Sequence, residues 1–413
     1  MLSHIFRYSS RNTKRQLNSV NQIAEWFKPT DIITHCPTLA DRFPFHLDAF
    51  LYESPPSPDQ AAQCHNQFCK LLEKESGARI WTVREILKQM TPERLRTLVI
   101  DSSKIRFDIS PSVKISQFSE KMQREYFYFS LSNLSKENLI DLLMLNPEVT
   151  ISVDSSSTGF SCTSIPVSPL ANLLFTRDQQ IVTSKGLVMG SFSTPQRSSE
   201  TKMMKVIWSQ LRVPVIGSIH PPWCLEGGDF IPLGKDLAIF GTGIRTSNHA
   251  VYQLMKEDLI GTNRVVIVED RYDNSQERSH LDTYFAALDE KVAVIVDAIA
   301  RDAPSYLRIA HEYVKKDGKY QLESQSPFGA WLKKEGYNLI NVTLDQQKDG
   351  IIDFIHLGKD SHGVPKILSI DSELEDVLKF AGVKTNVVYM DLSPITSMHG
   401  GAHVATQVFR ANK

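Results

Sequence analysis

The feature that most constrains the fold is a series of short apolar runs after Thr150, each the length of a β-strand. Gly, Pro, Asn and Asp separate the runs, and stretches with helical spacing lie between several of them, at residues 199–210, 247–259 and 326–335. Strands that alternate with helices indicate an α/β body. The strand-length runs lie at residues 173–175, 180–182, 186–189, 237–240, 265–268, 292–296, 339–342 and 387–390.

The first 150 residues have a different texture. Residues 31–35 predict a strand, and residues 59–77 predict a helix that ends at a glycine. From Trp81 to about residue 147 the apolar period becomes helical, and Thr82 with Glu85 forms a capping-box pattern at its start. We therefore expect a basic N-terminal extension at 1–25, an α/β body at 26–77 and 149–413, and an inserted, mostly helical subdomain at 78–148.

Composition excludes several classes of protein. The chain has 413 residues with 46 Lys+Arg and 47 Asp+Glu, and this balance argues against nucleic acid as the main partner. No run of about eighteen apolar residues is present, so we expect no membrane-spanning helix. The five cysteines are scattered and form neither a disulfide framework nor a zinc pattern, so we expect a reducing compartment and no metal. They are Cys36, Cys64, Cys69, Cys162 and Cys224.

The amino-acid composition of the N-terminal segment can be interpreted in two ways. Its first 24 residues contain no Asp or Glu but include Arg7, Arg11, Lys14 and Arg15 among several serines. This pattern resembles an organelle-targeting presequence, including those of hydrogenosomes, and is equally consistent with a disordered basic start. The expected location is the cytoplasm or, alternatively, a mitochondrion-related organelle.

Four short polar clusters lie at the ends of the expected strands. They are residues 172–178, ending in Arg177-Asp178; 226–229, Glu-Gly-Gly-Asp; 280–283, His-Leu-Asp-Thr; and the glycine-rich 398–407. His280 and Asp282 are two residues apart, so on a strand they share one face. A carboxylate beside an imidazole raises its pKa, which suits a general acid. Taken singly, the first cluster is better explained by a surface salt bridge and the second by a polar turn, and a lone His-x-Asp is common by chance.

Together, the order and spacing of these clusters resemble the arginine deiminase family, guanidino-group-modifying enzymes of the pentein superfamily. The matching segments are Asn-Leu-Leu-Phe-Thr-Arg-Asp at 172–178, Glu-Gly-Gly-Asp at 226–229, Gly-Ile-Arg-Thr at 243–246, His-Leu-Asp-Thr at 280–283 and the C-terminal glycine turn. The resemblance implies a five-bladed α/β propeller of ββαβ units, with the helical subdomain inserted. It also implies a homo-oligomer that needs no cofactor.

The resemblance further implies a reaction, the hydrolysis of L-arginine to L-citrulline and ammonia through a Cys-amidino intermediate. Asp178 and Asp282 would grip the guanidinium by charge-assisted hydrogen bonds. His280 would protonate the departing ammonia and then activate water, and Glu226 would orient its imidazole. The residues expected to hold the rest of the substrate are Asn172, Arg197, Arg245, His399 and Gly401.

The nucleophile position departs from the family. The pattern Gly400-Gly401-Ala402-His403 places the family's cysteine at Val404, which has no reactive atom. The chain as given is therefore expected to be inactive or nearly so, as an engineered variant or as a natural paralogue. A non-catalytic arginine-binding protein or a regulatory partner of an active deiminase is the alternative. A weaker one is a deiminase of another guanidine, such as agmatine or peptidyl arginine, because His399 stands where the family tends to carry Arg.

Overall fold

A computed structural model describes residues 17–37, 52, 57–109, 120–153, 160–166 and 169–411. Most of the basic N-terminal extension, with all four of the cationic residues on which the presequence prediction depends, lies outside these residues. None of the helices within the described ranges is long and apolar enough to cross a bilayer.

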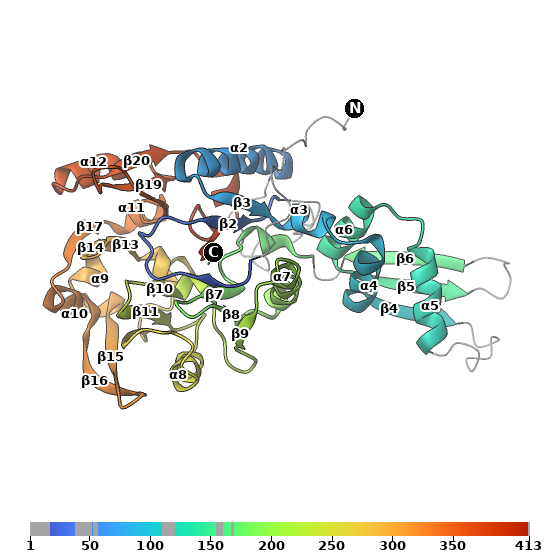
Figure 1. Ribbon diagram of the computed structural model, residues 1–413, viewed down its shortest axis with the longest axis horizontal. Coiled ribbons are helices and arrows are strands. Elements are labelled where there is room, and N and C mark those ends of the chain that lie inside the picture. The colour runs from blue at the N-terminus through green and yellow to red at the C-terminus, as the bar shows by residue number, and fades with distance from the viewer. Residues whose placement is uncertain are drawn as a thin grey trace.

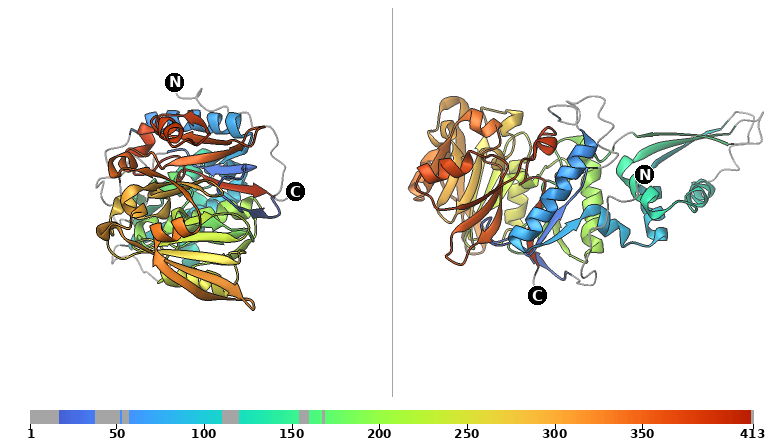
Figure 2. Two further views of the ribbon diagram at one scale, coloured as in Figure 1. Left: turned by 90° about the vertical axis from the view of Figure 1, so that its left-hand side faces the viewer. Right: turned by 90° about the horizontal axis from the view of Figure 1, so that it is seen from above.

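Five of the six sheets formed by the described residues are built on one pattern. In each, a first strand pairs antiparallel with a second, and the second pairs parallel with a third that follows a helix. A parallel return needs a crossover, and the helix supplies it. The α/β body expected from the sequence is therefore a ββαβ unit repeated five times (Figures 1 and 2).

We number these units 1 to 5 along the chain by their first strands. Unit 1 is β7 (Gln180–Val182), β8 (Leu187–Met189), α7 (Ser198–Gln210) and β9 (Val215–Ser218). Unit 2 is β10 (Phe230–Pro232), β11 (Leu237–Thr242), α8 (Asn248–Lys256) and β12 (Arg264–Asp270). Unit 3 is β13 (Phe285–Asp289), β14 (Val292–Val296), α10 (Phe328–Lys334) and β17 (Asn338–Val342). Unit 4 is β18 (Phe354–Lys359), β19 (Pro365–Ser369), α12 (Leu374–Phe380) and β20 (Asn386–Tyr389).

Unit 5 joins the two ends of the chain. Its first strand is β21 (Gln407–Ala411), and the rest is N-terminal: β2 (Asp31–Thr34), α2 (Pro58–Ser76) and β3 (Arg79–Thr82), with β1 (Val20–Asn21) on the outer edge of β21. α2 ends at Gly77 in the left-handed conformation, as its glycine predicts. The sheet of unit 2 is extended by the hairpin β15 (Arg308–Lys316) and β16 (Lys319–Pro327).

The segment between units 5 and 1 is less helical than the sequence indicates. It contains α3 (Val83–Lys88), α4 (Pro92–Ser102), α5 (Glu120–Ser130) and α6 (Lys136–Leu145), and also a sheet of β4 (Lys104–Ile109), β5 (Pro147–Val153) and β6 (Phe160–Pro166). Figure 1 shows these elements gathered at one end of the molecule. The spacing of apolar residues in this segment does not indicate the strands, because β4 pairs with β5 across a sequence gap of more than forty residues. The domain boundaries remain a prediction.

The core joins the inserted helices to the repeated units. One apolar cluster contains Leu139 and Ile140 of α6 together with Trp208 of α7, whose ring packs edge-on against Phe409 of β21. A second cluster fills the space among units 2, 3 and 4, with Phe285 and Trp331 in it. Burying apolar area on this scale is the main stabilising contribution to such a fold.

Short connecting elements join these units within the described residues. They are α9 (Asp297–Ala300), α11 (Leu344–Lys348), α13 (Ser393–Thr396) and the 3-10 turns η3 (Ala171–Leu174), η4 (Pro195–Arg197), η5 (Gly227–Asp229), η6 (Gln276–Arg278), η7 (Leu281–Thr283) and η8 (Pro304–Tyr306).

Two expected strands are such turns instead. The run at 173–175 lies in and just after η3, because the amide of Phe175 donates to the carbonyl of Asn172; an apolar run alone does not distinguish a buried strand from a buried turn. His280 caps η7 and Asp282 lies within it, so the two-residue strand spacing does not apply.

Candidate active site

A cavity of about 490 Å³ opens where the turns that precede the first strands of the units meet. Nine of the ten site residues predicted from the sequence line it. The tenth, Glu226, lies behind His280 and contacts it. The nine are Asn172, Asp178, Arg197, Arg245, His280, Asp282, His399, Gly401 and Val404.

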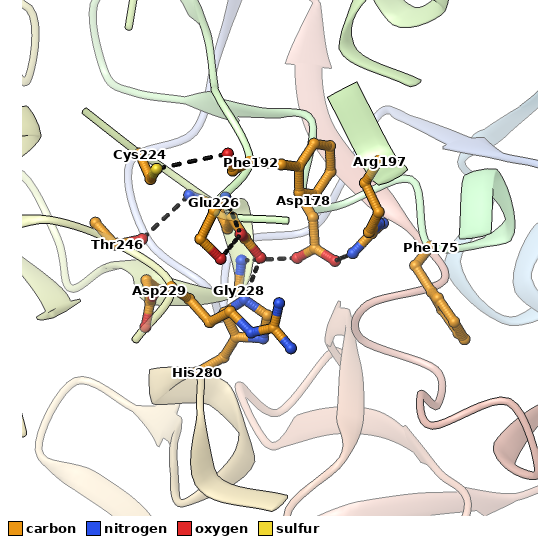
Figure 3. Close-up of polar contacts among 12 residues, drawn as sticks. Phe175, Asp178, Phe192, Arg197, Cys224, Glu226, Gly228, Asp229, Thr246 and His280 are labelled. Carbon is orange, nitrogen blue, oxygen red and sulfur yellow. Dashed lines mark hydrogen bonds and ion pairs between the residues drawn. The ribbon is translucent and has the colours of Figure 1, made fainter. Parts of the chain in front are cut away.

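His280 and Glu226 form a buried ion pair. The imidazole Nε2 lies 2.9 Å from Glu226 Oε2 (Figure 3). The other carboxylate oxygen accepts the amide and hydroxyl of Ser193. Burial alone would lower the pKa of His280, but the hydrogen bond to Glu226 and the charges of Asp178 and Asp229 raise it to about 10. Burial would raise the pKa of Glu226, yet His280 holds it at about 2. The imidazole is thus cationic at neutral pH and has a proton to donate.

The glycines of the 226–229 motif allow close approach of this pair to its neighbours. A Cβ on Gly228 would lie 3.0 Å from both carboxylate oxygens of Asp282 and 3.1 Å from His280 Cγ. A Cβ on Gly227 would lie 2.0 Å from the carbonyl of Arg177. Any side chain at either position would displace these groups, so the paired glycines are required by packing.

Asp178 is held on both of its oxygens. Oδ2 accepts Arg197 Nη1 at 2.8 Å, and Oδ1 accepts the backbone amide of Gly228 at 3.2 Å (Figure 3). The Arg197 guanidinium also contacts Glu200 and lies 4.2 Å from the ring centre of Phe192. Arg197, expected to hold a substrate carboxylate, is thus already paired with two protein carboxylates.

Asp282 is held on one oxygen only. Its Oδ2 lies 2.8 Å from Nδ1 of His403, whose Nε2 lies 3.4 Å from Glu25 Oε2. Asp282 Oδ1 is buried and has no hydrogen-bond partner among the described residues. Burial and Arg177 oppose the charged form of His403, but Asp282 and Glu25 outweigh them and raise its pKa to about 9. The contact with His403 is a charge-assisted hydrogen bond that fixes the orientation of the Asp282 carboxylate.

The C-terminal glycine turn forms one wall of the cavity. His399 adopts a left-handed φ of 60°, and a Cβ on Gly400 would lie 2.7 Å from Val404 Cγ2. The Val404 carbonyl accepts the amide of Arg177, and its side chain faces the cavity. Arg245 also lines the cavity; its Nη2 donates to Gln276 at 2.6 Å, and its Nε is buried without a partner within the described part of the chain.

Comparison with known proteins identifies the family. The family described as arginine deiminase matches residues 48–410, which is most of the chain. The chain belongs to the arginine deiminase family. An arginine deiminase from Staphylococcus aureus strain JH9 is 24% identical over 298 residues, which cover 68% of this chain and 69% of that protein.

Solved structures show that the chain has the pentein fold. A DDAH from Pseudomonas aeruginosa complexed with citrulline has a TM-score of 0.52 at 13% identity, covering 93% of this chain and 100% of that one. An amidinotransferase of the saxitoxin biosynthetic pathway from Microseira wollei has a TM-score of 0.54 at 11% identity, covering 95% and 98%. At these identities the likeness concerns the fold, and it confirms the five-unit architecture implied by the motifs.

No described cysteine side chain takes the place of the nucleophile that the arginine deiminase pattern puts at Val404. None of Cys36, Cys64, Cys69 and Cys224 lines the cavity. Cys224 Sγ lies 3.5 Å from the carbonyl of Phe192 and burial raises its pKa, so it is a poor thiolate (Figure 3). Cys162 belongs to β6, and its side chain is not among those that the structure describes. Within the described residues no cluster of three or more His, Cys, Asp or Glu is arranged to hold a metal ion.

Sequence reasoning missed two groups of residues at this site. Glu25 and His403 form the chain of contacts behind Asp282, and His403 was visible only as part of the glycine turn. Asp353 lines the cavity and accepts the amide of His403, but no motif surrounds it in the sequence.

Proposed function

We propose that this cavity binds the guanidinium of L-arginine and that the chain as given does not convert it to citrulline. The supporting observation is a pocket that holds a cationic His280 and several aspartates around Val404. Family membership makes the reaction class a hydrolase acting on amidines. The binding half of that chemistry needs charged residues, which are present, and the covalent half needs a thiolate, which Val404 does not supply.

Each polar group has a place in the family's reaction. A guanidinium is a planar cation with five N–H donors, and carboxylates such as Asp282 match it by charge-assisted hydrogen bonds. In an enzyme with cysteine at position 404, the thiolate would attack the central carbon and form a C–S bond, and the proton on His280 would go to the departing ammonia. Deprotonated His280 would then remove a proton from water, whose oxygen attacks the same carbon and breaks the C–S bond. In this chain, which has no thiol at position 404, the reaction does not proceed beyond the bound substrate.

Calorimetry and a citrulline assay on the purified protein test both parts of this proposal. We expect L-arginine to bind and no citrulline to form. Citrulline at rates typical of enzymes, on the order of 1–1000 per second, would show that Val404 is not at the nucleophile position. Absence of binding at millimolar L-arginine would leave a structural role or a role as partner of an active deiminase.

A second candidate function is recognition of a different guanidine. His399 lies in the cavity wall with a left-handed backbone, where the family tends to carry an arginine beside the substrate carboxylate. An imidazole is a weaker carboxylate ligand than a guanidinium because it lacks the planar fork of donors. Agmatine and a peptidyl arginine lack a free α-carboxylate, so tighter binding of either than of L-arginine would favour this second function.

The expected location of the protein, the cytoplasm or a mitochondrion-related organelle, stays a prediction.

A further inference from the structure

All five units contribute a residue to the site just before their first strand, and one of these residues has no assigned role. Units 1, 2, 3 and 5 contribute Asp178, Glu226, Asp282 and Val404. In unit 4 the residue directly before β18 is Asp353, and it lines the same cavity. The repeated architecture therefore delivers a fourth carboxylate to the centre.

The contacts of Asp353 leave one of its oxygens open to the cavity. Oδ1 accepts the backbone amide of His403 at 2.8 Å. Oδ2 has no hydrogen-bond partner among the described residues and lies 2.3 Å from where a Cβ of Gly401 would be. Only glycine at 401 leaves room for this carboxylate to lie against the turn.

Asp353 and Asp282 both contact the same residue, His403. The ring of His403 binds Asp282 Oδ2, and the backbone amide of His403 binds Asp353 Oδ1. Each aspartate then has one unpartnered oxygen, whereas both oxygens of Asp178 are already occupied. Each of these two unpartnered oxygens is an acceptor to which a cationic ligand can donate an N–H group.

The raised pKa of Asp353 agrees with a site for a cationic ligand. Removal from water, together with the negative charge of Asp282, raises the pKa of Asp353 to about 6 although His403 and Arg177 oppose the shift. A carboxylate with a shift in this direction is insufficiently stabilised by its own protein, and a bound cation would lower its pKa again.

We infer that Asp353 is a specificity-determining residue that, together with Asp282, binds the cationic end of the ligand through its N–H groups. This inference rests on the proposed guanidinium site and adds a ligand-contacting residue to it. A planar guanidinium can donate to both carboxylates at once, whereas a neutral urea group at the same place gains no charge pairing.

Calorimetry with two ligands tests the inference. L-Arginine and L-citrulline differ at this end of the molecule, the first cationic and the second neutral. Asp353→Asn removes the charge and keeps a carbonyl oxygen for the amide of His403. At about pH 8, where Asp353 is ionised, we expect this change to weaken L-arginine about tenfold or more and to alter L-citrulline by less than about threefold.

Asp349→Asn is the matched control. Asp349 lines the rim of the same cavity and is exposed to solvent, so the substitution should leave both affinities within about twofold of wild type. A merely structural role of Asp353 would instead weaken both ligands equally in Asp353→Asn.

The outcomes separate this inference from the proposed function. If Asp353→Asn binds L-arginine as tightly as wild type, the inference is wrong and the guanidinium site stands. If wild type binds neither L-arginine nor any other guanidine, both fail. The wild type alone provides a further check, should Asp353→Asn not fold: binding L-citrulline as tightly as L-arginine would overturn the inference.

Discussion

The imidazole of His280 lies 2.9 Å from a carboxylate oxygen of Glu226, a residue with no exposed surface and separated from it by 54 positions in the chain. Neither residue could be buried in its charged form alone, because desolvation of an unpaired charge costs several kcal/mol. As a pair they hold a proton-bearing imidazole at the cavity wall. The proposed chemistry and the stability of the site depend on the same contact.

Replacing Glu226 by Gln should lower the pKa of His280 from about 10, because the hydrogen bond to the carboxylate and the charge of Glu226 are lost while only the charges of Asp178 and Asp229 still oppose burial. An NMR titration of the His280 ring measures this directly.

In wild type the raised pKa of His280 stabilises the fold fully below about pH 6.5, and this contribution is lost as the pH rises through about 10. The lowered pKa of Glu226 contributes above about 4.5 and is lost as the pH falls through about 2.

The pair therefore stabilises the protein most between about pH 4.5 and 6.5, and Glu226→Gln should cost about 3 kcal/mol of unfolding free energy in that window. Urea denaturation at a series of pH values checks the size and the pH profile. A wild-type His280 that titrates near 6.5 would contradict the prediction.

Introducing the family's nucleophile with Val404→Cys should produce citrulline from L-arginine at least about a thousandfold faster than wild type. Val and Cys are close in size, so the turn should fold unchanged. Val404→Ala is the control, since it changes the packing without adding a thiol and should remain inactive. A Val404→Cys protein that binds L-arginine and forms no citrulline would show that another part of the site is not competent.

The affinity of wild type for L-arginine should fall as the pH is lowered from about 8 to about 5. Protonation of Asp353, whose pKa is raised to about 6, removes a negative charge from the cavity. His280 and His403, with pKa values of about 10 and 9, stay cationic throughout this range. Calorimetry at several pH values provides the measurement.

Asp229 also titrates in this range, because burial raises its pKa to about 7. The same series with Asp353→Asn separates the two carboxyl groups. A pH dependence that survives this substitution undiminished would assign the effect to Asp229.

Gly401→Ala should weaken L-arginine binding about tenfold or more and destabilise the fold by about 1–3 kcal/mol. The added methyl group would lie 2.3 Å from Asp353 Oδ2 and 2.8 Å from Ile370 Cδ1, so the carboxylate must move away from its place. Gly243→Ala is the matched control, because its nearest neighbour, Asp270 Cβ, would be at an ordinary 3.4 Å. Calorimetry and urea denaturation of both variants decide the point, and equal effects of the two substitutions would contradict it.

Local features of the fold were predictable because they depend on neighbouring residues. Ser247 accepts the amide of Ala250 at the start of α8, and Thr82 does the same for Glu85 at α3. The strands β4, β5 and β6 were missed because their pairing with one another, rather than their own periodicity, makes them strands. Residues 280–282 were read as a strand because a spacing of two residues places side chains on one face of a strand. In the structure they form the turn η7, and the side chains of His280 and Asp282 contact Glu226 and His403 instead.

From the sequence alone, the order and spacing of the motifs predicted the family, because each motif is a short run of consecutive residues. The resemblance then implied the ββαβ units and the nucleophile position at Val404. Only the tertiary structure decided which carboxylates remain free. Asp282 meets His403 across 121 residues and Asp353 meets the same residue across 50. Contacts of this kind depend on how the units close around the centre, because burial and charge pairing act through space and leave no local pattern in the chain.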